Sequence, residues 1–163
     1  MDGAALIPEF DHEFAQTRRS LERAPADRWD WKPHEKSYSL GRLVSHLAEL
    51  PTWTGATLDV DVFEMDPSWE PFHAPTPEEA LAAFDENLAR AREALASASA
   101  EKLAETWSFK DGDETLMSMP KGAVVRSFIL NHNVHHRAQL GVYLRLLDVP
   151  VPAIYGPSAD EEG

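Results

Sequence analysis

Apolar side chains recur at alternating spacings of three and four residues in four separate stretches of the chain. In the first stretch the repeated positions are Ile7, Phe10, Phe14, Thr17 and Leu21. This spacing places them on one face of an amphipathic helix. The following residues 24–39 contain two prolines and mixed polar side chains, which predicts a connecting loop.

The second stretch predicts a helix that begins just after a serine. Ser37 and Ser39 are both suitable N-caps. The apolar stripe consists of Leu40, Leu43, Leu47, Leu50 and Thr54. Pro51 lies inside this pattern and predicts a kink or a helix end. Residues 59–75 are acidic, aromatic and proline-containing, and we expect them to form an irregular crossover.

The third stretch has the clearest start. Thr76 is the expected N-cap, Pro77 the first helical residue and Glu79 the return partner of a capping box. The buried face is then Leu81, Phe84, Leu88, Ala91 and Leu95. Residues 104–119 follow, with Asp111-Gly112 between two short β-prone runs, which predicts a small β-hairpin.

The fourth stretch, residues 121–147, is the longest. Four amphipathic helices without convincing strand alternation predict an all-α four-helix bundle. At 163 residues the chain is long enough for a single domain, residues 1–163, around one core. In the proline-rich tail we expect the first part to pack on the body, and the last of residues 153–163 to be solvated and flexible.

The charge balance excludes some function classes. The chain carries 15 basic and 28 acidic residues, a formal charge of −13, which repels phosphate backbones and argues against nucleic-acid binding. It has no cysteine, so thiolate metal sites and a cysteine nucleophile are excluded. No stretch has the pattern of a secretory signal or a membrane span, and we expect a cytoplasmic protein without membrane contact.

Three histidines interrupt the fourth stretch, in the segment NHNVHHRAQL. A projection at about 100° per residue predicts one apolar arc formed by Val125, Phe128, Ile129, Tyr143, Leu146 and Leu147. His132 and His136 fall near the middle of this arc and one turn apart, whereas His135 falls at its margin. The three histidines are therefore not equivalent.

Two imidazoles at positions i and i+4 of a helix can converge on one metal ion. The same spacing also suits a hydrogen-bonded interior pair. His132 is followed by Asn133, so the general base of an H-E-x-x-H protease is missing. His46, at the edge of the second stripe, is either an ordinary boundary residue or a third ligand from a facing helix. Three such ligands leave positions open for water or substrate.

Other polar and aromatic residues are weaker candidates. Glu49 follows His46 by one turn and is either a proton acceptor or a solvated helix residue. Arg137 and Gln139 suit an anionic group or a structural hydrogen bond. Three aromatic residues suit either a pocket or the core: Trp53, Trp107 and Tyr143. We interpret the remaining histidines, which lie in polar or loop contexts, as surface residues: His12, His34 and His73.

Three segments carry a family resemblance: LVSHLAELP, NHNVHHRAQLGVYLRLLDVPVP and IYGPSADE. The chain resembles the DinB (damage-inducible) or YfiT-like superfamily over nearly its whole length. The resemblance implies a four-helix bundle in an up-up-down-down order with a long crossover, assembled as a homodimer. It also implies a divalent metal on His46, His132 and His136, with His135 a neighbouring non-ligand. Three imidazoles suit zinc, nickel, iron and copper alike, and nickel, zinc or iron is the expected metal.

The resemblance and the residues together favour a metal-dependent enzyme acting on a small molecule. A metal on three histidines would activate a water, as in a hydrolase, or a thiol, as in a thiol S-transferase. Because the chain has no cysteine, the thiol would come from outside the protein. The alternative is a non-catalytic, metal-stabilised dimer that binds a partner or small ligand.

Overall fold

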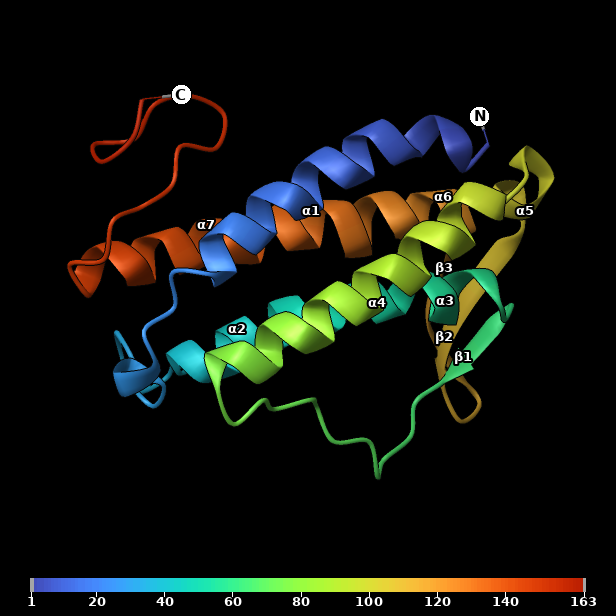
Figure 1. Ribbon diagram of the computed structural model, residues 1–163. Coiled ribbons are helices and arrows are strands. Elements are labelled where there is room, and N and C mark those ends of the chain that lie inside the picture. Colours follow the sequence, from blue (N-terminus) through green and yellow to red (C-terminus); the bar gives the residue numbers. More distant parts are fainter. Residues whose placement is uncertain (1, 163) are drawn as a thin grey trace.

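The computed structural model describes residues 2–162, so Met1 and Gly163, the two ends of the expected domain, lie outside the described residues. Four long helices pack side by side and a small sheet covers one end of the bundle (Figure 1). The helices of the bundle are α1 (Ile7–Leu21), α2 (Leu40–Glu49), α4 (Pro77–Ser97) and α7 (His132–Leu146). The shorter helices are α3 (Trp53–Leu58), α5 (Ala100–Ala104) and α6 (Lys121–Val124). A π-helical segment, Val125–Asn131, joins α6 to α7, and 3-10 turns occupy Ala4–Leu6, Ala26–Arg28 and Leu50–Thr52.

Side-chain caps mark the helix starts that the sequence predicts. The Ser39 hydroxyl accepts from the backbone N–H of Arg42 at 3.2 Å, so Ser39 rather than Ser37 caps α2. The Thr76 hydroxyl likewise accepts from Glu79 N at 3.2 Å, which confirms the cap of α4. These bonds satisfy N–H groups that have no partner within the helix. Pro51 falls in the 3-10 turn immediately after α2, as a helix-ending proline should.

Long-range ion pairs show that α1 and α4 are antiparallel. Arg18, late in α1, bonds Asp85 in the first half of α4 at 2.8 Å. Asp11, early in α1, accepts from Arg92, late in α4, at 2.8 Å. The residue numbers in contact therefore rise along α1 as they fall along α4, as in an antiparallel pair.

The remaining helices complete the arrangement. Glu9 of α1 pairs with Arg126 just before α7, and Thr17, two turns later in α1, donates to Asn133 at 2.8 Å. α7 is therefore parallel to α1, whereas α2 runs in the same direction as α4 (Figure 1).

The four-helix bundle and its long crossover are confirmed, but the helices follow an up-down-down-up order rather than the expected up-up-down-down order. An up-up-down-down bundle needs two long crossovers. Here residues 22–39 turn back at one end of the bundle, and only residues 59–76 travel along its length (Figure 1). The single crossover joins the parallel helices α2 and α4. The other two pairs of consecutive helices, α1 with α2 and α4 with α7, are therefore antiparallel.

The expected hairpin is present and is part of a three-stranded sheet. β2 (Thr106–Asp111) pairs antiparallel with β3 (Glu114–Pro120), and Gly112 in the turn has φ +55°, a value that glycine adopts without strain. The crossover adds β1 (Val62–Glu64), parallel to β2. The sequence does not predict this strand, because three residues are too short for a recognisable alternation.

The core is formed by the predicted faces of α1, α2 and α4, but the face of the fourth helix is rotated from the predicted arc. Val125 and Ile129 are buried as expected. Phe128 and Leu146 are exposed instead, and the buried positions further along are Asn133, Arg137, Leu140 and Leu144. The π-helical segment has i→i+5 bonds, so a uniform 100° projection loses register across it.

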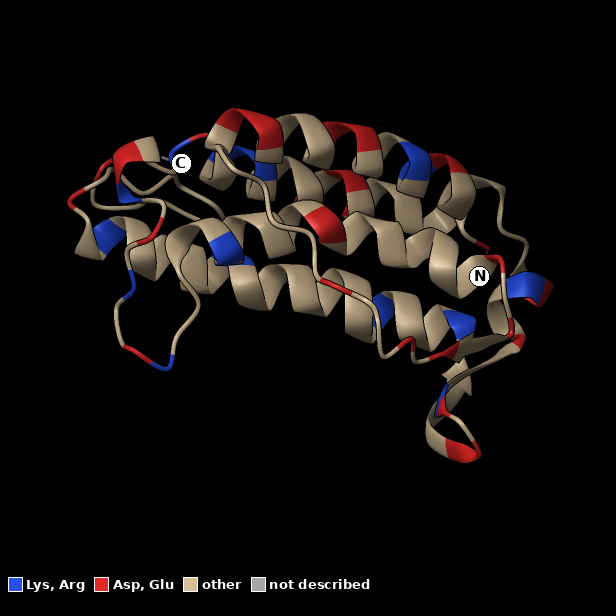
Figure 2. Ribbon diagram, turned by 90° about the horizontal axis from the view of Figure 1, so that it is seen from below, with Lys and Arg blue, Asp and Glu red and all other residues tan. Residues whose placement is uncertain are grey.

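The acidic end of the tail contacts the helices. Glu161 pairs with Arg19 at 2.8 Å and with Arg23, and Asp160 accepts from Arg145. Acidic and basic residues are scattered along the helices and loops (Figure 2), and acidic residues are the more numerous. None of the helices within residues 2–162 is both long enough and apolar enough to cross a membrane.

Candidate metal centre

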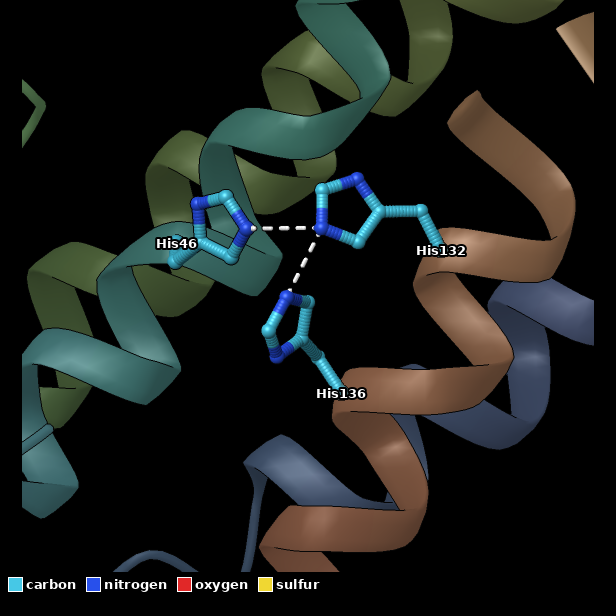
Figure 3. A group of neighbouring side chains, drawn as sticks. All are labelled: His46, His132 and His136. Atoms are coloured by element: carbon cyan, nitrogen blue, oxygen red, sulfur yellow. Dashed lines mark hydrogen bonds between the residues drawn. The ribbon is translucent and has the colours of Figure 1, made fainter. Parts of the chain in front are cut away.

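Three histidines from two facing helices meet at one point between α2 and α7. His132 Nε2 lies 3.3 Å from His46 Nε2 and 2.8 Å from His136 Nε2 (Figure 3). One ring nitrogen of each residue lies within 4.8 Å of the others. The antiparallel packing of α2 against α7 brings His46 to the pair, and the helical rise places His132 and His136 one turn apart.

The donor set fits a divalent metal ion. Two nitrogens bound at about 2.0–2.1 Å in a tetrahedral site are separated by roughly 3.3 Å, close to the separations found here. Hydrogen bonding alone is a poorer explanation, because His132 Nε2 has either one hydrogen or one lone pair and faces two other nitrogens. A cation between the rings would accept all three lone pairs. The cluster is therefore consistent with a metal site, and its ligands do not identify the metal.

Burial keeps the three imidazoles in the neutral form that binds metal. Removal from water, with the neighbouring His136 and His132, lowers the pKa of His46 to about 3. Burial likewise lowers the pKa of His136 to about 4. Burial lowers the pKa of His132 as well. Each ring therefore offers a lone pair at neutral pH.

A chain of hydrogen bonds on α7 orients one of the rings. Gln139 Oε1 lies 2.7 Å from His136 Nδ1 and can accept its hydrogen, which leaves the lone pair on Nε2. The amide nitrogen of Gln139 lies 3.0 Å from Nε2 of the exposed His135. His135 thus lies outside the cluster, as expected, and supports it only through Gln139.

A cavity of about 290 Å³ opens beside the cluster. Arg42, His46, Glu49 and Trp53 line it from one side at spacings of four, three and four, which place them in one stripe of helical turns. Its other walls are mainly aromatic or apolar: Trp69, Trp107, Phe109, Met117, Val124 and Phe128. An apolar cavity with a few polar groups at one end has the form of a small-molecule site.

The structure brings together some of the predicted residues and separates others. Glu49 lies in the cavity, and burial raises the pKa of its carboxyl group. Trp53 and Trp107 line the same cavity, whereas Tyr143 lies beside a second hollow on the far side of His136.

Residues outside the cluster have other roles. Arg137 is buried against Glu13, away from the cavity. The remaining predicted surface histidines are exposed, as expected: His12, His34 and His73.

Arg42 lines the cavity, although the sequence analysis did not name it as a candidate. Its spacing could have indicated this position, because Arg42, His46 and Glu49 stand at i, i+4 and i+7 of one helix and therefore share a face. Trp69 and Phe109 were also missed. They come from the crossover and the hairpin, whose positions over the bundle no helical periodicity could supply.

Comparison with known proteins shows the family of the chain. Residues 4–162 match the DinB family. The chain belongs to the DinB family. Among curated proteins it is similar to the uncharacterized protein YrdA of Bacillus subtilis (strain 168), with 25% identity over 160 residues, covering 96% of this chain and 89% of YrdA.

A solved structure supports the fold of this DinB-family protein. The chain is similar to the crystal structure of a DinB-like protein from Bacillus cereus ATCC 10987, with a TM-score of 0.74 and 17% identity. The match covers 92% of this chain and 95% of that chain. Family and fold are thereby shown, and the chemistry has to be argued from the site.

Proposed function

We propose that this DinB-family protein is a metal-dependent enzyme that acts on a small molecule. His46, His132 and His136 would bind a divalent metal, for which nickel, zinc and iron are the candidates, although three imidazoles also suit copper. The observation that carries the proposal is the convergence of three neutral imidazoles, of which His46 and His132 line a largely apolar cavity. Three protein ligands with adjoining open space are typical of catalytic rather than structural metal sites.

A divalent metal bound there would lower the pKa of a water or thiol and so supply a nucleophile near neutral pH. The side chains of the protein would prepare the site for that chemistry. Gln139 would hold the tautomer of His136, and the aromatic walls would exclude water from the apolar part of the substrate. Glu49, which lines the cavity and whose carboxyl pKa is raised by burial, would accept a proton from the nucleophile.

Hydrolysis and thiol transfer both follow from this arrangement. Since the chain has no cysteine, thiol transfer would require an external thiol. The competing function is a non-catalytic metal-stabilised binder, in which a backbone or side-chain group would close the open positions of the metal and no substrate cleft would exist. The cavity next to the cluster favours the enzyme.

Metal content tests the shared premise. Purified protein should contain about one metal ion per chain by elemental analysis, and the His132→Ala/His136→Ala variant should contain almost none. The matched control is His135→Ala, which removes an exposed imidazole between the two and should keep the metal. Equal metal content in all three proteins would show that the ligands are misassigned.

Activity assays separate the enzyme from the binder. The metal-loaded protein should hydrolyse ester or amide probes, or consume a low-molecular-weight thiol in the presence of aryl or alkyl halides, and lose this activity on chelation. The Glu49→Gln variant should bind metal normally and react more slowly. A protein that binds metal but remains inactive toward all of these probes would favour the binder.

We further propose that the chain forms the homodimer that the family resemblance implies. Sedimentation velocity should give a mass of twice 18.2 kDa. A monomer at micromolar concentration would contradict this part of the proposal.

A further inference from the structure

Arg42 has an unusual environment for an arginine. It lies one turn before His46 on α2 and lines the same cavity. Its Nη1 atom is buried and has no hydrogen-bond partner among the described residues. A buried donor without a partner, above all on a charged group, is unfavourable and is rare in folded proteins.

The other arginines show that partners are abundant. Within residues 2–162, every arginine except Arg42 has a carboxylate oxygen within 4.0 Å. The chain carries 28 acidic residues, so the missing partner does not reflect a shortage of carboxylates. Arg42 is therefore held apart from the ion pairs that engage the other arginines.

The groups around Arg42 do not replace an anion. Tyr38 places its ring 5.1 Å from the guanidinium carbon, a cation–π contact that orients the side chain without accepting its in-plane hydrogens. Glu49 lies on the same stripe, but its carboxylate accepts from Phe72 N at 3.4 Å and forms no ion pair with Arg42 within 4.0 Å. Thr57 Oγ1, also lining the cavity, is a second buried polar atom without a partner in the described chain.

The apolar part of the cavity extends beyond the histidines. Trp53, Trp69 and Phe109 also line an adjoining hollow of about 510 Å³, whose further walls include Phe63 and Met65. Trp69 is 54% exposed, so the hollow has an aromatic wall that the folded chain does not cover. Exposed aromatic surface next to a polar site suits the apolar body of a ligand.

We propose that Arg42 recognises a carboxylate on the ligand of this site, and that the ligand is a small carboxylic acid with an aromatic or other apolar body. The planar guanidinium offers paired N–H groups that match the two oxygens of a carboxylate. Residues at i and i+4 of a helix are about 6 Å apart at Cβ, so a molecule held by Arg42 would present its neighbouring atoms to the histidines. The inference rests on the proposed function only in taking the ligand to be the substrate.

Two matched probes test the proposal directly. Isothermal titration calorimetry would compare 3-phenylpropionate with its neutral amide, 3-phenylpropionamide, on metal-loaded and on chelated protein. We expect the carboxylate to bind roughly tenfold tighter or more in both preparations. In Arg42→Gln this ratio should fall to near one, and in Arg42→Lys it should be intermediate because the charge remains but the paired geometry is lost.

Two further variants serve as controls. Arg28→Gln removes an exposed positive charge outside the cavity and should keep the wild-type ratio. Trp69→Ala should weaken both probes to a similar extent, because it removes apolar contact and leaves Arg42 in place. Circular dichroism would confirm that each variant is folded.

The outcomes separate this proposal from the proposed metal enzyme. If the carboxylate preference persists in Arg42→Gln but disappears in His132→Ala/His136→Ala, the metal rather than Arg42 binds the carboxylate and the inference is overturned. No preference in wild-type protein also overturns it. A preference that depends on Arg42 in a protein without metal or activity would keep the inference and reject the enzyme.

Discussion

Two polar clusters lie on neighbouring faces of α7, and they differ in how far their hydrogen bonds are satisfied. On the α1 side, Arg137 Nη1 donates to the carbonyl of Glu13 and Nη2 to its carboxylate, both at 2.7 Å. The Tyr155 hydroxyl, from the tail, completes the cluster with a bond of 2.6 Å to Glu13. On the α2 side, the histidine cluster directs three ring nitrogens at one point and has the unpaired Arg42 beside it.

The contrast distinguishes a structural polar cluster from a functional one. Each charged group of the Glu13–Arg137 cluster has an oppositely charged partner within the chain, so the cluster requires no bound ion or ligand. The histidine cluster and Arg42 retain bonding capacity that only an added cation or anion would use. Metal-binding nitrogens and charged groups with unused bonding capacity are therefore better indicators of function here than buried charge as such.

Breaking the closed cluster should have the largest effect on stability. Arg137→Met leaves the Glu13 carboxylate buried without its cation, and should lower the free energy of unfolding by about 3–5 kcal/mol. Urea denaturation measures this change. The matched control is Arg126→Met, which breaks the exposed Arg126–Glu9 pair near the same helix and should change stability by at most about 1 kcal/mol.

Metal content provides the second half of this comparison. If the α1 side is purely structural, folded Arg137→Met protein should bind as much metal per chain as the wild type. A variant that folds normally but loses its metal would show that the two clusters are not separate in function.

Gln139 tests how finely the open cluster is oriented. Gln139→Leu removes the acceptor that holds the His136 tautomer and should weaken metal binding about 10–100-fold, as measured by competition with a chromogenic chelator. Gln139→Glu keeps an acceptor and should stay close to wild type. Equal affinity in both variants would show that the hydrogen bond to Gln139 is unimportant for the site.

Acidification should reveal the open cluster in metal-free protein. His46 and His136 have pKa values lowered to about 3 and about 4, whereas unfolded histidines take up protons near pH 6.5. Below pH 6.5 the unfolded chain therefore binds more protons than the folded chain. The stability contribution is present above this pH and is lost as the pH falls towards 4.

The size of the effect can be bounded. Each titrating histidine contributes at most about 1.4 kcal/mol per pH unit, and solvent at these half-buried rings reduces it further. Urea midpoints at pH 7 and pH 5 measure the loss, which His46→Gln/His136→Gln should largely remove. An undiminished pH dependence in that variant would assign it to other groups. The Glu13 cluster adds nothing in this window, because hydrogen bonds from Tyr155 and Arg137 outweigh burial and lower the pKa of that carboxyl below its ordinary value.

Local patterns in the sequence were sufficient to predict the helices and part of the site. The caps at Ser39 and Thr76 depend on short-range hydrogen bonds, and the apolar stripes depend on a repeat within one helix. The spacing of His132 and His136 follows from the same helical geometry. The bundle expected from the helices made His46 a candidate third ligand, and the family resemblance then implied it as a ligand, although it lies 86 residues from His132 and shares no local pattern with it.

Other features depend on how distant segments pack. The direction of each helix depends on the path of its connection, because residues 22–39 turn back and residues 59–76 cross the bundle although the two segments are equally long. The π-helical segment rotated the face of α7 so that Asn133 and Arg137 turned inward. No periodicity could show that Arg42 would lack a carboxylate partner, because this depends on every acidic residue in the fold. The sequence by itself thus determined the helices, their caps and the pair of histidines on α7, through interactions between near neighbours. The tertiary structure alone decided that the pair meets His46 beside a cavity, and which buried charges were left without partners, because those contacts join residues far apart in the chain.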